Sequence, residues 1–197
     1  MDCSERIIGN LKLLEEIINL MNQANKAIMD VYQTSNNNVK LKKDNTPVTK
    51  ADLAANKILT NGLKNLFPEI PIVSEEDQSS LDIPKTNKIF WLIDPLDGTK
   101  EFINKNDDFT CNVALVENNV STLGFVSVPV KGLIYFGGKK FGSNCINKDK
   151  KIFKIRYKSN SRVCRVVASK SHLNESTQEF IDNINGPIEL IQAGSSL

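Results

Sequence analysis

The chain has 197 residues, which is enough to bury a hydrophobic core in one or two domains. Its residues are 40% hydrophobic and 24% charged, an ordinary balance for a globular protein, and 25 basic against 23 acidic residues leave a net charge of +2. This balance gives no electrostatic case for a nucleic-acid polymer as partner. No apolar run approaches the roughly 20 residues of a membrane span, so no transmembrane segment is expected.

Cysteine usage and the N-terminal residues indicate the cellular setting. The four cysteines are widely spaced, with no C-x-x-C pair, which is typical of reduced thiols in the cytoplasm. The N-terminus lacks the basic-then-apolar pattern of a secretion signal. A catalytic cysteine is disfavoured, because the single histidine, His172, would have to serve it.

The first 70 residues carry a helical pattern. Apolar residues at steps of three and four predict one long amphipathic helix over residues 5–32, whose apolar face serves core packing or a homodimer surface. The polar segment 34–44 is expected to be a mobile loop. A second helix follows, with Thr49 as N-cap and Asp52 as the acidic partner of a short capping box, and Pro68 should stop it.

Beyond residue 68 the pattern changes to strands. Apolar or alternating runs predict strands at 70–73, 88–93, 111–115, 120–128, 133–136, 151–155, 162–168 and 188–191. The run at 88–93 is apolar after its first residue, which is typical of a strand buried on both faces. Residues 117–119 predict a hairpin turn, the glycines at 137, 138 and 142 predict turns, and 176–184 a short helix. Helices followed by a strand-rich middle predict a layered α/β (α+β) sandwich.

Basic residues gather in one part of the strand-rich half. They are Lys148, Lys150, Lys151, Lys154, Arg156 and Lys158. Basic residues on a short apolar run are typical of a solvated edge strand or hairpin. We favour this interpretation over a binding patch.

Two acidic residues follow the predicted strand at 88–93 in the segment 94–99, whose sequence is DPLDGT. Pro95 disfavours helix at the residue before it, so the strand must end at Asp94. Asp94 and Asp97 can converge from a tight turn, and two acids at the end of an apolar strand repel each other unless a cation lies between them. Oxygen ligands without a His or Cys cluster favour Mg²⁺.

Gly98 and Thr99 follow at a place where a helix could begin. Free amides at a helix start can hold a phosphate, and glycine permits close approach of the backbone. A metal and a phosphate at one turn suggest metal-assisted phosphoryl transfer to water. The spacing alone leaves an alternative open, a structural turn in which both acids only cap backbone amides.

The sequence at this turn resembles a known family. Segment 94–99 matches the D-P-[IL]-D-G-T signature of the inositol monophosphatase-like, lithium-sensitive phosphatases. Segments 47–52 (PVTKAD) and 73–76 (VSEE) lie where that family carries its P-V-T-x-A-D and S/G-E-E motifs. The resemblance implies the αβαβα fold of the sugar phosphatases.

Within this family the chain looks most like the CysQ-type 3′(2′),5′-bisphosphate nucleotidases. The resemblance rests on segments 100–102 (KEF), 109–115 (FTCNVAL) and 168–172 (ASKSH). It implies Mg²⁺-dependent hydrolysis of the 3′-phosphate of adenosine 3′,5′-bisphosphate, a small-molecule substrate, to AMP and phosphate. Two alternatives stay open: a phosphatase of inositol or sugar phosphates, and a non-catalytic remnant that binds metal and nucleotide.

The resemblance also implies a ligand set for two or three Mg²⁺ ions. The carboxylates of Glu75, Asp94 and Asp97 and the carbonyl of Leu96 would bind them, with Asp94 bridging two ions. Glu76 would support these ligands without binding an ion itself. Glu75 and Glu76 on sequence grounds alone would be a solvated pair before a loop.

Further positions correspond to catalysis and substrate binding. Asp52 and Thr99 would orient the water that attacks phosphorus, and the amides of Gly98 and Thr99 would hold the phosphate. Asp52 can also be explained as a helix-start acid alone, and His172 as a surface polar residue. The nucleotide part of the substrate would lie against Ser169, His172, Ser195 and Ser196.

The chain departs from the family pattern at its C-terminal end. Relatives carry a downstream Trp-Asp motif that completes the second metal site, whereas the one tryptophan here is Trp91. We expect a metal-bearing domain over 1–155 and an incomplete second α/β portion over 156–197, with activity impaired. A fragment of a longer protein and a degenerate relative are both open. Some relatives work at the inner face of a bacterial membrane, so peripheral attachment there is open too.

Overall fold

The computed structural model describes residues 3–34, 40–41, 47–82, 88–139, 141–156, 162–169 and 174–194. Its helices are α1 Cys3–Ile8, α2 Leu11–Tyr32, α3 Lys50–Leu66, α4 Thr99–Ile103 and α5 Glu175–Asp182, with 3₁₀ turns η1 Gln78–Asp82 and η2 Pro129–Lys131. Its strands are β1 Lys40–Leu41, β2 Pro47–Val48, β3 Ile72–Ser74, β4 Ile89–Asp97, β5 Thr110–Glu117, β6 Val120–Val128, β7 Leu133–Gly138, β8 Gly142–Ile146, β9 Ile152–Ile155, β10 Cys164–Ser169 and β11 Ile188–Ala193.

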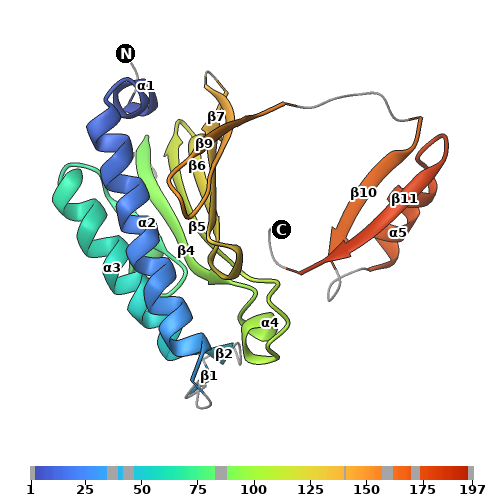
Figure 1. The fold of residues 1–197 in the computed structure, drawn as a ribbon, viewed down its shortest axis with the longest axis horizontal. Helices are drawn as coiled ribbons and strands as arrows, with labels where there is room; N and C mark the ends of the chain where they lie inside the picture. The colour runs from blue at the N-terminus through green and yellow to red at the C-terminus, as the bar shows by residue number, and fades with distance from the viewer. Residues whose placement is uncertain are drawn as a thin grey trace.

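A seven-stranded sheet is the centre of the fold. Its strands lie in the order β3-β4-β5-β6-β7-β8-β9, with β3 parallel to β4 and each later pair antiparallel. Helices α2 and α3 lie side by side on one face of this sheet (Figure 1). The parallel strands β10 and β11 form a separate two-stranded sheet with α5 between them in the chain. The predicted α/β layering is confirmed.

The second unit leaves apolar side chains in contact with solvent. Val167, Phe180 and Leu190 are exposed on β10, α5 and β11. A complete layer would cover such side chains, because burial of apolar surface is what stabilises it. The incomplete second α/β portion stays a prediction.

The predicted helix over 5–32 is wrong in one respect, because the structure has two helices with a break at Gly9 and Asn10. The side chain of Asn10 accepts hydrogen bonds from the backbone N–H of Lys12 and Leu13 and so caps α2. The break leaves the apolar period intact. Periodicity alone therefore could not reveal it.

Helix α3 begins as predicted at the N-cap Thr49, with a complete capping box formed by Asp52. The loop predicted at 34–44 lies outside the described residues over 35–39 and 42–44. Within it, β1 pairs with β2 just before α3. In the part of the chain that the structure describes, no helix is long and apolar enough to cross a membrane.

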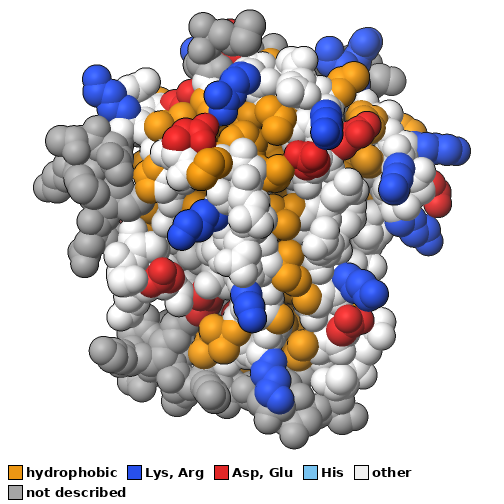
Figure 2. Space-filling model, turned by 90° about the vertical axis from the view of Figure 1, so that its left-hand side faces the viewer, with side chains coloured by type: hydrophobic (Ala, Val, Ile, Leu, Met, Phe, Trp, Pro, Cys, Tyr) orange, Lys and Arg blue, Asp and Glu red, His pale blue; other side chains and the backbone are white. Residues whose placement is uncertain are grey.

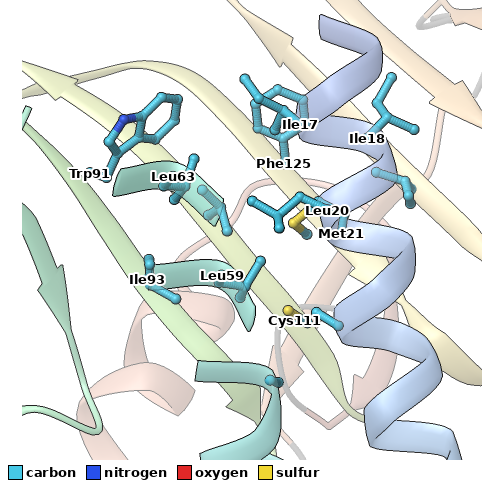
Figure 3. Close-up of a cluster of buried hydrophobic side chains, with 14 of the residues drawn as sticks. Ile17, Ile18, Leu20, Met21, Leu59, Leu63, Trp91, Ile93, Cys111 and Phe125 are labelled. Atoms are coloured by element: carbon cyan, nitrogen blue, oxygen red, sulfur yellow. The ribbon is translucent and has the colours of Figure 1, made fainter. Parts of the chain in front are cut away.

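The core lies between the helices and the sheet. Side chains of α2 and α3, among them Met21, Leu59 and Leu63, meet Trp91 of β4 and Phe125 of β6 (Figure 3). The opposite side of the helices faces solvent, and there charged side chains of both signs surround a narrow band of hydrophobic ones (Figure 2). The amphipathic pattern of the sequence therefore describes both helices correctly.

The expectation that the strand at 88–93 is buried on both faces is wrong. Trp91 and Ile93 are buried against the helices, whereas Leu92 on the opposite face is 44% exposed. Among the described elements, α2 and α3 both pack on the same face, so an apolar residue on the other face is left open. Composition could not distinguish these two environments.

The predicted hairpin is confirmed, since β5 and β6 are joined at Asn118 and Asn119, both with positive φ. Strand β8 was not predicted, because its sequence GSNCI is largely polar and does not alternate. The expected edge strand or hairpin is confirmed for the described part of the basic stretch: Lys154 lies in β9, which among the described strands pairs with β8 alone, and Lys148 and Lys150 lie in the turn that joins β8 to β9.

Three aromatic rings fix the end of α2 against α4 and the start of β5. The ring centroids of Tyr32, Phe102 and Phe109 lie 4.8 to 5.1 Å apart in tilted and edge-on pairs. Such pairs contribute about 0.5–1.5 kcal/mol beyond area burial. They hold α4 in place directly after the acidic turn.

The close approach of β7 and β6 near the β7–β8 turn predicts a mutational asymmetry. A Cβ on Gly138 would overlap the Thr122 carbonyl oxygen, whereas a Cβ on Gly124, on the neighbouring strand β6, would meet nothing within 4 Å. Gly138→Ala should therefore lower the free energy of unfolding by about 2 kcal/mol or more, and Gly124→Ala should change it by less than about 0.5 kcal/mol. Urea denaturation measures both, and equal effects would contradict this packing.

Candidate active site

The acidic turn lies where β4 leaves the sheet. β4 pairs regularly with β5 up to Asp94, which lies opposite Asn112, and the register shifts before Asp97 pairs with Thr110. Such a bulge inserts one residue into a strand and bends it. Pro95, which has no N–H to donate to a ladder, lies within it. The expectation that the strand ends at Asp94 is therefore wrong: β4 runs on to Asp97 through a bulge, and the bend carries two carboxylates.

Gly98 turns the chain from β4 into α4. Its φ of 87° and ψ of 40° are left-handed, a conformation that glycine adopts without steric cost. Helix α4 begins at Thr99, and the N–H of Phe102 donates to the Gly98 carbonyl at 2.9 Å. The predicted helix start after the acidic turn is confirmed, although the helix has only 5 residues.

The parallel pairing of β3 with β4 brings Glu75 to Asp94. Ser74, the last residue of β3, lies opposite Ile93, and the backbone N–H of Glu75 donates to the Ile93 carbonyl at 3.1 Å. Glu75 and Asp94 each follow this pair directly, so the two carboxyl groups come together and share a hydrogen bond. Asp97 adds a third like charge.

Asp94 points to the open face of the sheet. Side chains alternate between the two faces of a strand, so Asp94 lies on the face opposite the buried Ile93. This is the face on which Leu92, two residues earlier, is exposed. A hollow of about 240 Å³ on this face reaches Asp94 and Asn112. The half-buried Asp94 side chain therefore lines a hollow on the side opposite the helices.

Burial and crowding by like charges raise the pKa of Asp94 to about 8. Burial is the largest cause, followed by the charges of Glu75 and Asp97 and the hydrogen bond with Glu75, while the backbone of Leu96 acts in the opposite sense. The Oδ1 atom of Asp94 is also buried without a hydrogen-bond donor. A buried, unsatisfied acceptor beside further carboxylates is costly, and a cation would offset that cost.

These donors fit a hard divalent cation. The carboxylates of Glu75, Asp94 and Asp97 and the nearby carbonyl of Leu96 offer oxygen atoms only, the ligand type that Mg²⁺ prefers. Within the described ranges, no three Asp, Glu, His or Cys side chains already converge in coordinating geometry. The metal roles of these residues stay predictions.

Asp52 uses its two carboxylate oxygens for different contacts. Oδ2 accepts hydrogen bonds from the backbone N–H and the hydroxyl of Thr49, at 2.8 and 2.6 Å, and Oδ1 accepts one from the hydroxyl of Thr99 at 3.3 Å. Burial raises the pKa of this carboxyl, and the hydrogen bonds from Thr49 and Thr99 lower it. The helix cap and a contact with the turn that carries Thr99, which the sequence presented as alternatives, therefore coexist.

The hydroxyl of Thr99 has two acceptors at similar distance. Its Oγ1 lies 3.2 Å from the Leu96 carbonyl oxygen and 3.3 Å from Oδ1 of Asp52. One hydroxyl proton can be donated to only one of them at a time. The Leu96 carbonyl and Asp52 therefore compete for the Thr99 proton.

The remaining predicted residues lie outside this cluster or outside the described chain. Glu76 is half-buried, and its backbone N–H donates to the Ser74 hydroxyl at 3.3 Å. Ser169 is the last residue of β10, where the structure describes the backbone. His172, Ser195 and Ser196 lie outside the described residues.

Sequence reasoning missed Glu101 and Thr110 near the turn. Glu101 is buried in the first turn of α4, and Gly194 at the end of β11 packs so closely on it that a Cβ there would lie 2.9 Å from both Glu101 Cγ and Asp108 Cβ. Thr110 is fully buried and donates to Oδ2 of Asp97 at 3.5 Å. The sequence did show that an acidic residue, Glu101, follows Thr99 by two positions, and this was the signal that could have placed it near the turn.

Comparison with known proteins identifies the class to which this fold and turn belong. The sequence pattern of the family described as "Inositol monophosphatase family" matches residues 10–192. The chain therefore belongs to the inositol monophosphatase family, as the three motifs predicted.

Individual relatives are more specific. The 3′(2′),5′-bisphosphate nucleotidase CysQ of Shigella flexneri is 38% identical over 188 residues, covering 94% of this chain and 74% of that protein. CysQ of Buchnera aphidicola is 37% identical over 190 residues, covering 94% and 69%. The crystal structure of CysQ from Bacteroides thetaiotaomicron superimposes with a TM-score of 0.74 at 29% identity, covering 92% of this chain and 72% of the other.

Proposed function

We propose that this chain is a Mg²⁺-dependent 3′(2′),5′-bisphosphate nucleotidase that hydrolyses the 3′-phosphate of adenosine 3′,5′-bisphosphate to AMP and phosphate. The observation that carries the proposal is that Glu75, after β3, lies beside Asp94 and interacts with it together with Asp97 at the bend of β4, where Oδ1 of Asp94 is buried with no donor among the described residues. The substrate follows from the relatives, whose name states this activity and which match 94% of the chain. A cytoplasmic location is part of the proposal, because the four cysteines are free thiols.

The acidic cluster would hold two or three Mg²⁺ ions through Glu75, Asp94, Asp97 and the Leu96 carbonyl, with Glu76 supporting them. When bound, the cations neutralise charge on the phosphoryl oxygens and make water a stronger nucleophile. The transition state of phosphoryl transfer is loose and depends on positioning and positive charge more than on a protein nucleophile. A chain with a single histidine is therefore compatible with this chemistry.

Thr99 and Asp52 would move the proton of the attacking water. In this role the Thr99 hydroxyl would donate to Oδ1 of Asp52, and a lone pair of Thr99 Oγ1 would accept a hydrogen bond from water. Asp52 suits a proton acceptor, because burial raises its pKa while Thr49 fixes its orientation through Oδ2.

Substrate binding would involve both parts of the chain, a metal-bearing part over 1–155 and a nucleotide-binding part over 156–197. The amides of Gly98 and Thr99 would hold the phosphate. The contact of Gly194 with Glu101 supports this division, because it places the end of β11 beside the helix that begins at Thr99. The nucleotide would then contact Ser169, His172, Ser195 and Ser196.

Substrate preference tests the proposal. We expect the kcat/KM for adenosine 3′,5′-bisphosphate to exceed that for inositol 1-phosphate by at least about 100-fold, because polar groups built for a nucleotide stay unpaired with an inositol ester. Phosphate release in the presence of Mg²⁺ measures both. A preference for inositol 1-phosphate would show a phosphatase of the alternative specificity. Calorimetric nucleotide binding without any turnover would show a non-catalytic protein.

A further inference from the structure

A larger pocket lies between α2 and the turn that joins β8 to β9. Its volume of about 550 Å³ is within the range of small-molecule sites. It is lined by Asn19, Asn22, Gln23, Asn25, Lys26, Pro129, Gly132, Ile134, Ile146, Asn147, Lys148 and Lys150. None of these residues belongs to the candidate active site.

The pocket carries three uncompensated positive charges. Lys26 comes from α2, Lys148 and Lys150 come from the β8–β9 turn, and no acidic side chain lines the pocket. Across the described parts of the chain the one ion pair is Arg6–Glu69, so none of the three ammonium groups has a described acidic partner. Like charges around one pocket repel one another, and an anion between them offsets that repulsion.

The nearest carboxylate in sequence is oriented by its own turn. Asp149 lies between the two turn lysines but does not line the pocket, and its Oδ2 accepts from Asn147 Nδ2 at 3.5 Å. Oδ1 of Asn147 accepts from the backbone N–H of Asp149 and of Lys151, at 3.1 and 3.0 Å. These bonds fix the turn, so the two lysine stems start from a defined backbone.

The other wall is equally fixed. Gly132 has a φ of 61°, and a Cβ at this position would lie 3.4 Å from Cβ of Lys148, so the turn after η2 packs directly under that lysine. Asn25 is buried, and its Oδ1 accepts from the Ser127 hydroxyl at 2.7 Å. This bond fixes the orientation of Asn25, which lines the pocket. Preorganised cations and donors lower the cost of binding an anion.

An apolar groove continues from the same pocket. A neighbouring pocket of about 260 Å³ shares Asn19, Asn22, Ile146 and Lys150 with it. Its other lining residues are Leu11, Leu14, Glu15, Ile18 and Ile152. The joined groove is thus cationic at one end and mostly apolar at the other, with Glu15 as its single acid. A molecule with phosphate groups and a flat apolar ring matches both ends.

We propose that this groove binds a soluble small molecule that carries two or more phosphate groups and an aromatic ring, of the nucleoside polyphosphate class. Lysine suits phosphate as a point charge, and the side-chain amides can bind hydroxyl and ring polar atoms. The site is separate from the proposed catalysis. It also assigns a role to Lys148 and Lys150, which sequence analysis placed with the solvated edge strand.

Calorimetry with adenosine β,γ-imidotriphosphate and inorganic triphosphate in EDTA tests the proposal, because chelation removes divalent cations from the candidate active site. The pocket variant combines Lys26→Gln, Lys148→Gln and Lys150→Gln. The control variant makes the same change in charge at the exposed residues Lys12, Lys57 and Lys88. We expect the pocket variant to bind at least about tenfold more weakly and the control to stay within about twofold of the unmodified protein.

Localisation of the ligand completes the test. In ¹H–¹⁵N NMR spectra the bound anion should shift the amide signals of Gly132 and Asn147. Equal weakening in both lysine variants, no binding to the unmodified protein, or binding that Asp94→Asn removes would each overturn the proposal. Binding only to vesicles that contain phosphatidylinositol 4,5-bisphosphate, without binding of the free anions, would overturn the assignment to a soluble ligand.

Discussion

Replacement of Asp94 by asparagine is expected to abolish the rise in melting temperature that Mg²⁺ produces and to lower phosphate release from adenosine 3′,5′-bisphosphate by a factor of roughly 1,000. Asp94 interacts with both Glu75 and Asp97, and its Oδ1 atom has no donor among the residues that the structure describes. An amide keeps the shape of the side chain but removes the charge that a divalent cation needs. Differential scanning fluorimetry with Mg²⁺ and with EDTA measures the first effect.

The same variant should be more stable than the unmodified protein when metal is removed. Asp94 is a buried carboxyl beside two others, so the folded state must either hold a proton on it or tolerate the repulsion. Removing this charge should raise the free energy of unfolding in EDTA by about 1–3 kcal/mol. Asp30→Asn, at an exposed position of α2, is the matched control and should change neither quantity. An unaltered Mg²⁺ response in Asp94→Asn would remove the ligand assignment.

Asp52→Asn should lower kcat by about 100-fold or more while leaving the Mg²⁺ response intact. An amide has a single oxygen. If that oxygen keeps the hydrogen bonds of Thr49, the NH₂ group faces Thr99 and cannot accept a proton from its hydroxyl. Phosphate release and thermal melting, measured on the same preparation, separate the catalytic effect from the structural one.

Thr49→Ala is the control for this substitution. It removes the N-cap hydroxyl of α3 but keeps the carboxylate of Asp52 beside Thr99, so the expected loss is about 1 kcal/mol of stability with kcat changed by no more than a few-fold. If both variants lost stability and kept their kcat, Asp52 would be a cap only, and the proposed proton transfer would be wrong.

The local parts of the site could be predicted from the sequence because local chemistry determines them. Pro95 ends the regular part of β4, Gly98 permits a left-handed turn, and Thr49 caps the helix that carries Asp52. Each of these effects operates within a few residues. The contact between Asp52 and Thr99 spans 47 positions in the chain, and no spacing rule predicts it.

The environment of β4 and the break before α2 show the limits of pattern reading. Leu92 and Ile93 are equally apolar, yet the first is exposed, because burial depends on which face the helices cover. The apolar period of residues 5–32 runs on across Gly9 and Asn10, so only the capping chemistry of Asn10 marks the break. Sequence reasoning therefore identifies the elements better than their surroundings.

The short strand β3 has a consequence for the strength of metal binding. It contributes Glu75 from a three-residue strand at the edge of the sheet, held on one side by β4. A short edge strand opens locally at a small free-energy cost. If only the closed edge presents all three carboxylates, the measured affinity contains the free energy of closing it. Binding of the cation and pairing of β3 with β4 would then be coupled. A substitution that weakens the pairing of β3 would therefore lower the affinity for the cation even though it changes no ligand.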